Sequence, residues 1–393
     1  MTDHTVVRAG HLSRAWLLAA CIGAGFLPAV LLGQSEKGAG KGKKDDKPMT
    51  AADSARAEEE KRIDRARKAA SRALFASTDP VEFTLIANYG AISRDRDTLS
   101  TKRFDGVVVV KDSSGADRRI PVRLRTRGHF RLMARNCRFV PLRIDFPDSG
   151  LKDTPFAGQK GIKLGTHCQN NDDRYDEYTR REYLAYSLFN AVTDQSFRAR
   201  LAMANYVDSA SGKSVARRVA LFIESENDVG RRLQANVREM RGALFDDLDL
   251  DQLMNVSFFE YAIGNTDFSI YSLHNIRVAA TTTGRVIPLA YDFDFSGLVG
   301  AHYATPDPRM GLRSVRERRY RGPCRPIEAY QAAAARFIAK KPAMFAAIEA
   351  VPGFSRDEQN NARSYLQDFF SVIENPGRLK RELFDQCEKK AGV

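Results

Sequence analysis

The sequence contains few cysteines and histidines, and each shortage excludes a class of metal protein. Its five Cys include no CxxC pair, and their spacings are too wide for a zinc ribbon. Only six His occur among 393 residues, and none lies at metal-ligand spacing from His274. With 27 Gly and 15 Pro the chain is not collagen-like, and one uncharged stretch near the N-terminus is too little for a polytopic membrane protein.

The remaining composition is that of a globular protein. Hydrophobic residues make up 43% and charged residues 28% of the chain, which excludes a wholly disordered protein. A length of 393 residues predicts two domains or one large two-lobed domain. The net charge of +13, from 62 Lys and Arg against 49 Asp and Glu, predicts an anionic partner without identifying it.

The pattern of the N-terminal residues predicts an export signal. Arg8 and Arg14 precede the uncharged stretch Ala15 to Gln34, a basic region followed by an apolar one. Residues 1–34 are therefore predicted to be a signal peptide or an N-terminal membrane anchor, with attachment through residues 15–33 in the second case. The protein is expected to be secreted, periplasmic or attached to the cell envelope.

Four cysteines remain after this segment, an even number that predicts disulfides in an exported chain. We expect Cys137 to pair with Cys168 and Cys324 with Cys387, because each pair then stays within one half of the sequence.

Three regions follow the leader. Residues 35–78 are predicted to be a charged linker and an exposed helix, Thr50 to Ser77. Residues 79–225 are β-rich, and their short runs predict an antiparallel sheet covered by a helix around Tyr183 to Val192. Residues 226–393 are mainly helical. The predicted strands are Val81–Asn88, Gly106–Lys111, Arg119–Arg127, Pro141–Phe146, Gly161–Thr166, Leu201–Asp208 and Ser214–Glu224. The predicted helices of the last region are Asp228–Met240, Asp249–Gly264, Pro326–Ala350 and Ser355–Cys387.

One stretch of the last region gathers the residues suited to chemistry. A predicted helix ends at Gly264, and a polar loop with Asp267 and Asn275 leads into a predicted hairpin that ends at Asp292. A hairpin returns its second strand beside the first, so we expect Asp292 to lie close to Asn275 and the Asp267 loop. Carboxylate and amide oxygens are ligands suited to Mg²⁺ or Mn²⁺ together with substrate phosphate.

This order is similar to that of the catalytic loop and the metal-binding Asp of protein kinases, although the Asp267-to-Asn275 spacing is wider and no HRD or GxGxxG motif occurs. The chain more specifically resembles the CotH kinase family, atypical secretory kinases like spore coat protein H. The motifs that carry the resemblance are RLRTRG, PLRIDF, GIKLGTHC, REYLAY, ALFIE, GNTDFS with HN, and LAYDFDFSGLV.

The resemblance implies an α+β, two-lobed, atypical protein-kinase-like fold, with a β-rich N-lobe followed by a mainly helical C-lobe. It implies ATP and Mg²⁺ or Mn²⁺ as cofactors, and phosphorylation of Ser or Thr on exported proteins. Asp267 would then be the catalytic aspartate, and Asn275, Asp292 and Asp294 would bind metal. The alternative is a purely structural role, in which Asp267 caps the loop after the helix and Asp292 is a turn residue at the end of the strand.

The nucleotide contacts are less well defined. The position of the usual family Lys is occupied by Phe139-Val140-Pro141, so the phosphate contact is expected from Arg143, Lys163 or Arg127. We select Lys163, on a predicted strand ahead of the helix that carries Glu182, because kinases pair a strand Lys with a helix Glu. A strand Lys that points to solvent is the alternative.

Glu224 ends a predicted strand at the junction of the two lobes, where kinases contact adenine, so it is a further candidate nucleotide contact. An ion pair at the rim would explain a Glu at this position equally well.

A cluster of arginines indicates a partner. It predicts a docking site for an exported, acidic protein substrate or, as the alternative, a solvated basic loop. Nucleic acid is not expected, because aromatic residues are not interleaved with the cluster. The six arginines are Arg309, Arg313, Arg316, Arg318, Arg319 and Arg321.

A rival function is a non-catalytic, pseudokinase-like binding or scaffold protein at the cell envelope. A metal-dependent phosphohydrolase that uses Asp292 and Asp294 would need further ligands at short spacing, which the sequence does not offer.

Overall fold

The computed structural model describes residues 50–390, and the chain from Ala51 onward forms one compact unit. The predicted leader, residues 1–34, and the linker as far as residue 49 lie outside the described residues. Within residues 50–390, no helix is both long and apolar enough to cross a membrane.

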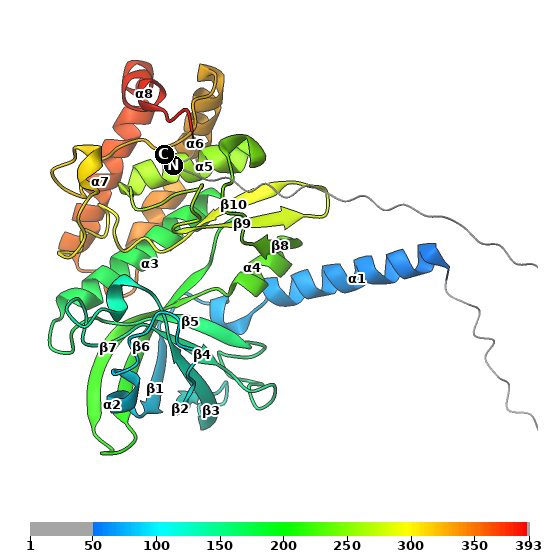
Figure 1. Cartoon of the computed structure of the whole chain (residues 1–393), viewed down its shortest axis with the longest axis vertical. Helices are drawn as coiled ribbons and strands as arrows, with labels where there is room; N and C mark the ends of the chain where they lie inside the picture. The colour runs from blue at the N-terminus through cyan, green and yellow to red at the C-terminus, as the bar shows by residue number, and fades with distance from the viewer. Residues whose placement is uncertain (1–49, 391–393) are drawn as a thin grey trace, which may run out of the picture. The chain divides into compact units, whose positions relative to one another are not determined.

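Seven strands form a closed barrel in the order β1-β2-β3-β4-β5-β7-β6 (Figure 1). Neighbours pair antiparallel except β1 and β6, which pair in parallel from Val81 opposite Ala202 to Ala87 opposite Asp208. The strands are β1 (Val81–Ala87), β2 (Phe104–Lys111), β3 (Asp117–Thr126), β4 (Leu142–Asp145), β5 (Gly161–Gly165), β6 (Ala199–Asp208) and β7 (Ser214–Ile223).

The expected fold class is therefore wrong. An antiparallel N-lobe sheet in a two-lobed, kinase-like fold would leave two free edges, whereas here the first strand pairs on both sides. In a closed barrel, side chains along a strand alternate between the interior and the exterior. Strand β1 shows this alternation, because every second side chain is buried. The buried side chains of the seven strands form a core of their own, in which Phe83 and Phe222 pack at 5.4 Å between ring centroids.

Helix α3 packs on the β6–β7 side of the barrel, and helices form most of the regular secondary structure after the barrel. The long helix α3 contacts β6 and β7 as well as α5 and α6, so it joins the barrel to the helical part (Figure 1). The helices are α1 (Ala51–Ala70), α2 (Tyr89–Ile92), α3 (Arg174–Val192), α4 (Glu226–Arg232), α5 (Leu250–Ile263), α6 (Ile327–Glu349), α7 (Arg356–Ile373) and α8 (Pro376–Glu382). Short 3₁₀ turns are η1 (Ala73–Phe75), η2 (Phe130–Leu132), η3 (Phe245–Asp247), η4 (Pro308–Met310) and η5 (Phe384–Gln386).

A second, three-stranded sheet has the order β10-β9-β8. Its strands are β8 (Ala235–Arg238), β9 (Ile276–Thr281) and β10 (Val286–Ala290), and the predicted hairpin is confirmed as β9–β10. The helix predicted over Asp228 to Met240 is partly wrong. The observed helix, α4, ends at Arg232, and Ala235–Arg238 instead form β8, which pairs with β9.

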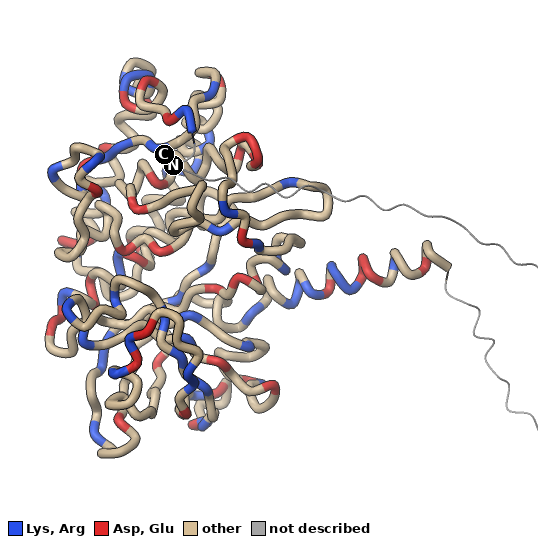
Figure 2. Tube along the Cα trace, viewed as in Figure 1, with Lys and Arg blue, Asp and Glu red and all other residues tan. Residues whose placement is uncertain are grey.

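The predicted exposed helix is present as α1, in which only Ala69 is buried. Figure 2 shows both charge signs along its length, and ion pairs such as Arg62–Glu59 at 2.7 Å link neighbouring turns.

Both predicted disulfides are confirmed, Cys137–Cys168 and Cys324–Cys387. Disulfides form and persist in oxidising compartments, so they suggest an extracytoplasmic location.

Candidate functional site

The loop that carries Asp267 begins where α5 ends in a left-handed turn. Gly264 has a φ of 65°, and a Cβ there would collide with the hydroxyl of Tyr365, so the position requires glycine. The side chain of Asn265 then accepts a hydrogen bond from the backbone N–H of Asp267 at 3.1 Å. The turn at the end of α5 and the hydrogen bond to Asn265 therefore fix the position of Asp267 in the loop.

Two side chains hold the carboxylate of Asp267. The Nδ2 of Asn275 donates to its Oδ2 at 3.1 Å and to its main-chain oxygen at 2.7 Å, and the Nε2 of His274 lies 3.0 Å from its Oδ1. Both oxygens of the Asp267 carboxylate are therefore held by side chains from the other end of the same loop. The hydrogen bond to Asp267 raises the pKa of His274, although burial opposes the shift.

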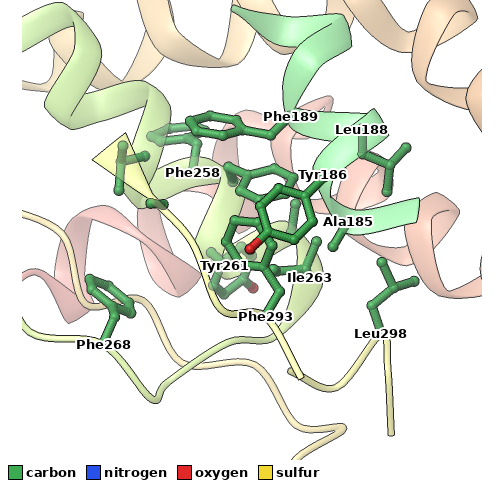
Figure 3. Close-up of a cluster of buried hydrophobic side chains, with 14 of the residues drawn as sticks. Ala185, Tyr186, Leu188, Phe189, Phe258, Tyr261, Ile263, Phe268, Phe293 and Leu298 are labelled. Carbon is green, nitrogen blue, oxygen red and sulfur yellow. The ribbon is translucent and has the colours of Figure 1, made fainter. Parts of the chain in front are cut away.

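Asp292 reaches the same place by the return strand of the hairpin. The N–H of Tyr291 donates to the main-chain oxygen of Asn275 at 3.0 Å, and the N–H of Asp292 donates to the hydroxyl of Tyr186 at 2.9 Å. Figure 3 shows Tyr186 of α3 beside Phe293 in the core, with 4.7 Å between ring centroids. Asn275 and Asp292 both have positive φ, 53° and 65°, a strained conformation for residues with a Cβ.

Three carboxylates crowd together beside this hairpin. Burial, followed by the charge of Asp292, raises the pKa of Asp294 to about 7, and the Tyr303 hydroxyl donates to Asp294 at 3.1 Å. Burial, followed by the charges of Asp294 and Asp292, raises the pKa of Glu182 on α3. The negative charge at this point is therefore only partly compensated by the protein.

Two cations, one from the barrel and one from the three-stranded sheet, meet beside Tyr291, the residue before Asp292. Lys163 on β5 contacts Glu226 at 3.0 Å, and Arg277 on β9 contacts the same carboxylate at 3.1 Å. Both cations lie over the ring of Tyr291, at 4.7 and 4.8 Å from its centroid. Burial lowers the pKa of Lys163, and the charge of Arg127 lowers it further. The expected pairing of Lys163 with Glu182 is not what the structure has, because the ammonium group lies against Glu226.

Arg127, directly after β3, is less engaged than Lys163. Its guanidinium makes no hydrogen bond or ion pair with residues 50–390, yet its charge lowers the pKa of both Glu182 and Lys163. Arg131 in the next turn donates to the main-chain oxygen of Thr166, and its charge lowers the pKa of Glu182 and Asp294. Sequence reasoning missed Arg131, Glu226 and Arg277, although Arg131 lies only three residues after the RLRTRG motif.

Two other expected nucleotide contacts are occupied by the protein itself. Glu224 is fully buried and pairs with Arg198 at 2.7 Å and Arg232 at 3.0 Å, the ion-pair alternative. Arg143 lies opposite Lys163 in the β4–β5 register and contacts Asp145 at 2.8 Å. Neither side chain is free to reach a ligand without breaking a pair.

The donor atoms fit a divalent cation only if a substrate contributes ligands. The described residues contain no group of three or more His, Cys, Asp and Glu side chains arranged to hold a metal ion. Mg²⁺, however, is usually held by one or two carboxylates together with substrate phosphates. Asp292 and Asp294 supply two such carboxylates, and Asn275, whose Nδ2 donates to Asp267, supplies an amide oxygen. These three residues would hold the ion.

The arginine cluster divides by what its members contact. Arg309 and Arg313 pair with the carboxylates of Asp307 and Glu317. The other four donate to main-chain oxygens: Arg316 to that of Gly297, Arg318 to those of Ala262 and Tyr365, Arg319 to that of Met310, and Arg321 to those of Thr266 and Phe268.

No model of a known protein family matches the chain, and a search of curated proteins finds no match either.

Proposed function

We propose that the protein is an exported, metal-dependent phosphotransferase that transfers the γ-phosphate of ATP to Ser or Thr of extracytoplasmic proteins. This is the activity that the resemblance to the CotH kinase family implies. The observation that carries the proposal is the meeting of Asp267, Asn275 and Asp292 at one end of the β9–β10 hairpin.

Each residue has a role in the proposed reaction. Asp267, with His274 and Asn275 fixing its two oxygens, would orient the acceptor hydroxyl and accept its proton. Arg127 would contact the phosphates, because its positive charge acts on Glu182 of the carboxylate cluster, and Lys163 would join it, because the charges of the two cations act on each other. A divalent cation held by Asn275, Asp292 and Asp294 would neutralise charge on the phosphates during transfer.

A second function is favoured by one observation. Lys163 lies against Glu226 at the start of α4 rather than Glu182 of α3, so the Lys163–Glu182 pair that the kinase resemblance implies is not formed. A pseudokinase-like protein that binds a nucleotide at the cell envelope without turnover would need no such pair.

Two substitutions separate these functions. Asp292→Ala should abolish metal-dependent ATP binding and transfer together, whereas Asp267→Ala should leave ATP affinity nearly unchanged and lower transfer by roughly 10² to 10⁴-fold. Binding is measured as the thermal shift with ATP and Mg²⁺ or Mn²⁺, and transfer as autophosphorylation.

Asp148→Ala is the control, because this exposed carboxylate pairs only with Lys160 at 3.5 Å. ATP binding without transfer in the unmodified protein would favour the binding function. Undiminished transfer by Asp267→Ala would contradict its catalytic role.

A further inference from the structure

The pocket next to Asp267 has a volume of about 520 Å³. Asp267 and His274 contribute to its lining, and the segment from Thr305 to Arg321 contributes half of the other lining residues. Asp267 is the residue proposed to orient the acceptor hydroxyl, so the chain on either side of that hydroxyl must occupy this pocket. Its other walls therefore decide which acceptors fit.

Three arginines line the pocket, and Arg321 is not available to a ligand. Its guanidinium donates to the main-chain oxygens of Thr266 at 2.8 Å and Phe268 at 2.7 Å, and it contacts Glu388 at 3.1 Å. Only 12% of its side chain is exposed. Arg321 therefore ties the pocket wall to the Asp267 loop.

Arg309 and Arg319 differ in what compensates their charge. Arg309 is 90% exposed but donates to both oxygens of Asp307, which neutralises it. Arg319 donates one hydrogen bond, to the main-chain oxygen of Met310 at 3.3 Å, and forms no ion pair with any residue between 50 and 390. Most of its N–H groups are therefore open to a ligand.

Arg319 is the lining arginine that pairs with no carboxylate of residues 50–390. The three carboxylates of the lining have other partners: Asp307 pairs with Arg309, Glu388 with Arg321, and Asp267 contacts His274. A carboxylate matches the planar fork of a guanidinium with two parallel hydrogen bonds, whereas a Lys side chain at the same place would be repelled.

We infer that this pocket binds an acidic peptide, in which a carboxylate near the accepting Ser or Thr lies against Arg319. The inference rests on the proposed function, since Asp267 places the hydroxyl, and it names the class of acceptor. It also narrows the predicted docking site from six arginines to one principal contact.

The test measures peptide binding without nucleotide. Two fluorescein-labelled peptides, one with Glu and one with Lys on both sides of a single Ser, are titrated with the full chain and followed by fluorescence anisotropy. The acidic peptide should bind more tightly, and Arg319→Glu should weaken it by roughly five-fold or more. The same variant should improve binding of the Lys peptide, a gain that misfolding would not produce.

Arg119→Glu is the matched control, because Arg119 is an exposed arginine on β3 with no ion pair to residues 50–390. It changes the net charge equally but should leave both affinities unchanged. Equal loss in the two variants would mean attraction by net charge alone and would overturn the inference, as would equal binding of the two peptides.

Phosphate transfer to the same peptides with ATP and Mg²⁺ separates the two proposals. Selective binding that depends on Arg319 but leads to no transfer would support the docking site and contradict the proposed activity. Transfer that is indifferent to neighbouring charge, with the same KM in Arg319→Glu, would contradict the docking site and leave the activity intact.

Discussion

At the scale of single residues, the candidate metal ligands hold the backbone in a conformation that folding alone disfavours. Asn275 and Asp292 have positive φ, and a non-glycine residue held there costs on the order of 1–3 kcal/mol. The hydrogen bond from the Asp292 N–H to Tyr186 and the Asn275 contacts with Asp267 oppose this cost. Strain at residues that also carry the candidate chemistry is typical of a functional site.

This strain predicts an unusual order of stability at position 292. Asp292→Gly should be more stable than Asp292→Ala by about 1 kcal/mol, because glycine adopts a φ of 65° without a steric penalty. Urea denaturation of the two variants measures the difference. Both should lose metal-dependent ATP binding equally, so an Ala variant as stable as the Gly variant would show that the backbone here is not strained.

Another residue prediction concerns Glu260, buried in α5 beneath the Asp267 loop. Burial raises its pKa from 4.5 to about 8, and the side chain of Asn265 offsets only part of this. Because the folded pKa is the higher one, the contribution of Glu260 to stability is complete below pH 4.5 and is lost as the pH rises through 8.

Glu260→Gln removes the ionisation and keeps the shape. Its free energy of unfolding should resemble that of the unmodified protein at pH 4.5 and should then gain on it by up to about 1.4 kcal/mol per pH unit until pH 8. Urea denaturation at pH 5, 6.5 and 8 gives the comparison. A constant difference between the two proteins would mean that Glu260 ionises normally.

At the scale of elements, local sequence patterns correctly predicted two hairpins and one helix, whose contacts join residues close together in the sequence. The β9–β10 hairpin follows from two β-rich runs around a Thr-Thr-Thr-Gly turn, and it alone brings Asp292 to Asn275. The β6–β7 hairpin and α1 follow in the same way. The helix expected beyond α4 failed because tertiary pairing with β9 overrode a helical pattern.

The side-chain contacts within the site could not be predicted from the sequence. Lys163 was expected beside Glu182, but it lies opposite Ile223 in the β5–β7 register, and Glu226 follows Ile223 by three residues and contacts Lys163. Arg131 reaches the carboxylates only because its loop folds over them, which no periodicity encodes.

The attachment of α1 gives a prediction at this scale. Arg72, just after α1, contacts Asp228 of α4 at 3.0 Å, with only 15% and 4% of the two side chains exposed. Arg72→Ala should cost about 2 kcal/mol, because it removes two hydrogen bonds from a buried carboxylate that keeps Arg231 as a partner at 3.1 Å. Arg65→Ala, within α1, should change stability by less than about 0.5 kcal/mol, since its pair with Glu58 is exposed. Chemical denaturation of both variants checks the contrast, and equal losses would contradict it.

At the scale of the whole molecule, pairing between residues far apart in the sequence determines how the predicted strands are assembled. The barrel closes only through the pairing of β1 with β6, strands far apart in the sequence. A pattern of alternating residues identifies each strand without saying whether the sheet is open or closed, which is why the expected fold was wrong.

The two disulfides are the other long-range connections, and each lies beside a different half of the candidate site. Cys137–Cys168 anchors the loop that carries Arg131, through hydrogen bonds of Arg138 N and Phe139 N to the main-chain oxygen of Cys168. Cys324–Cys387 anchors the acceptor pocket, because Cys324 N donates to the main-chain oxygen of Glu388, whose carboxylate pairs with Arg321.

Removing either bridge should therefore have a similar effect on stability and a different effect on activity. Loop separations of 31 and 63 residues correspond to similar losses, about 3.7 and 4.3 kcal/mol on the chain-entropy estimate. The double variant Cys137→Ala, Cys168→Ala should raise the KM for ATP, whereas Cys324→Ala, Cys387→Ala should raise the KM for an acidic peptide. Steady-state transfer assays well below both melting temperatures measure the two constants. Because the stability losses are matched, a general loosening would raise both KM values in both variants, and that outcome would show that the bridges do not support separate halves of the site.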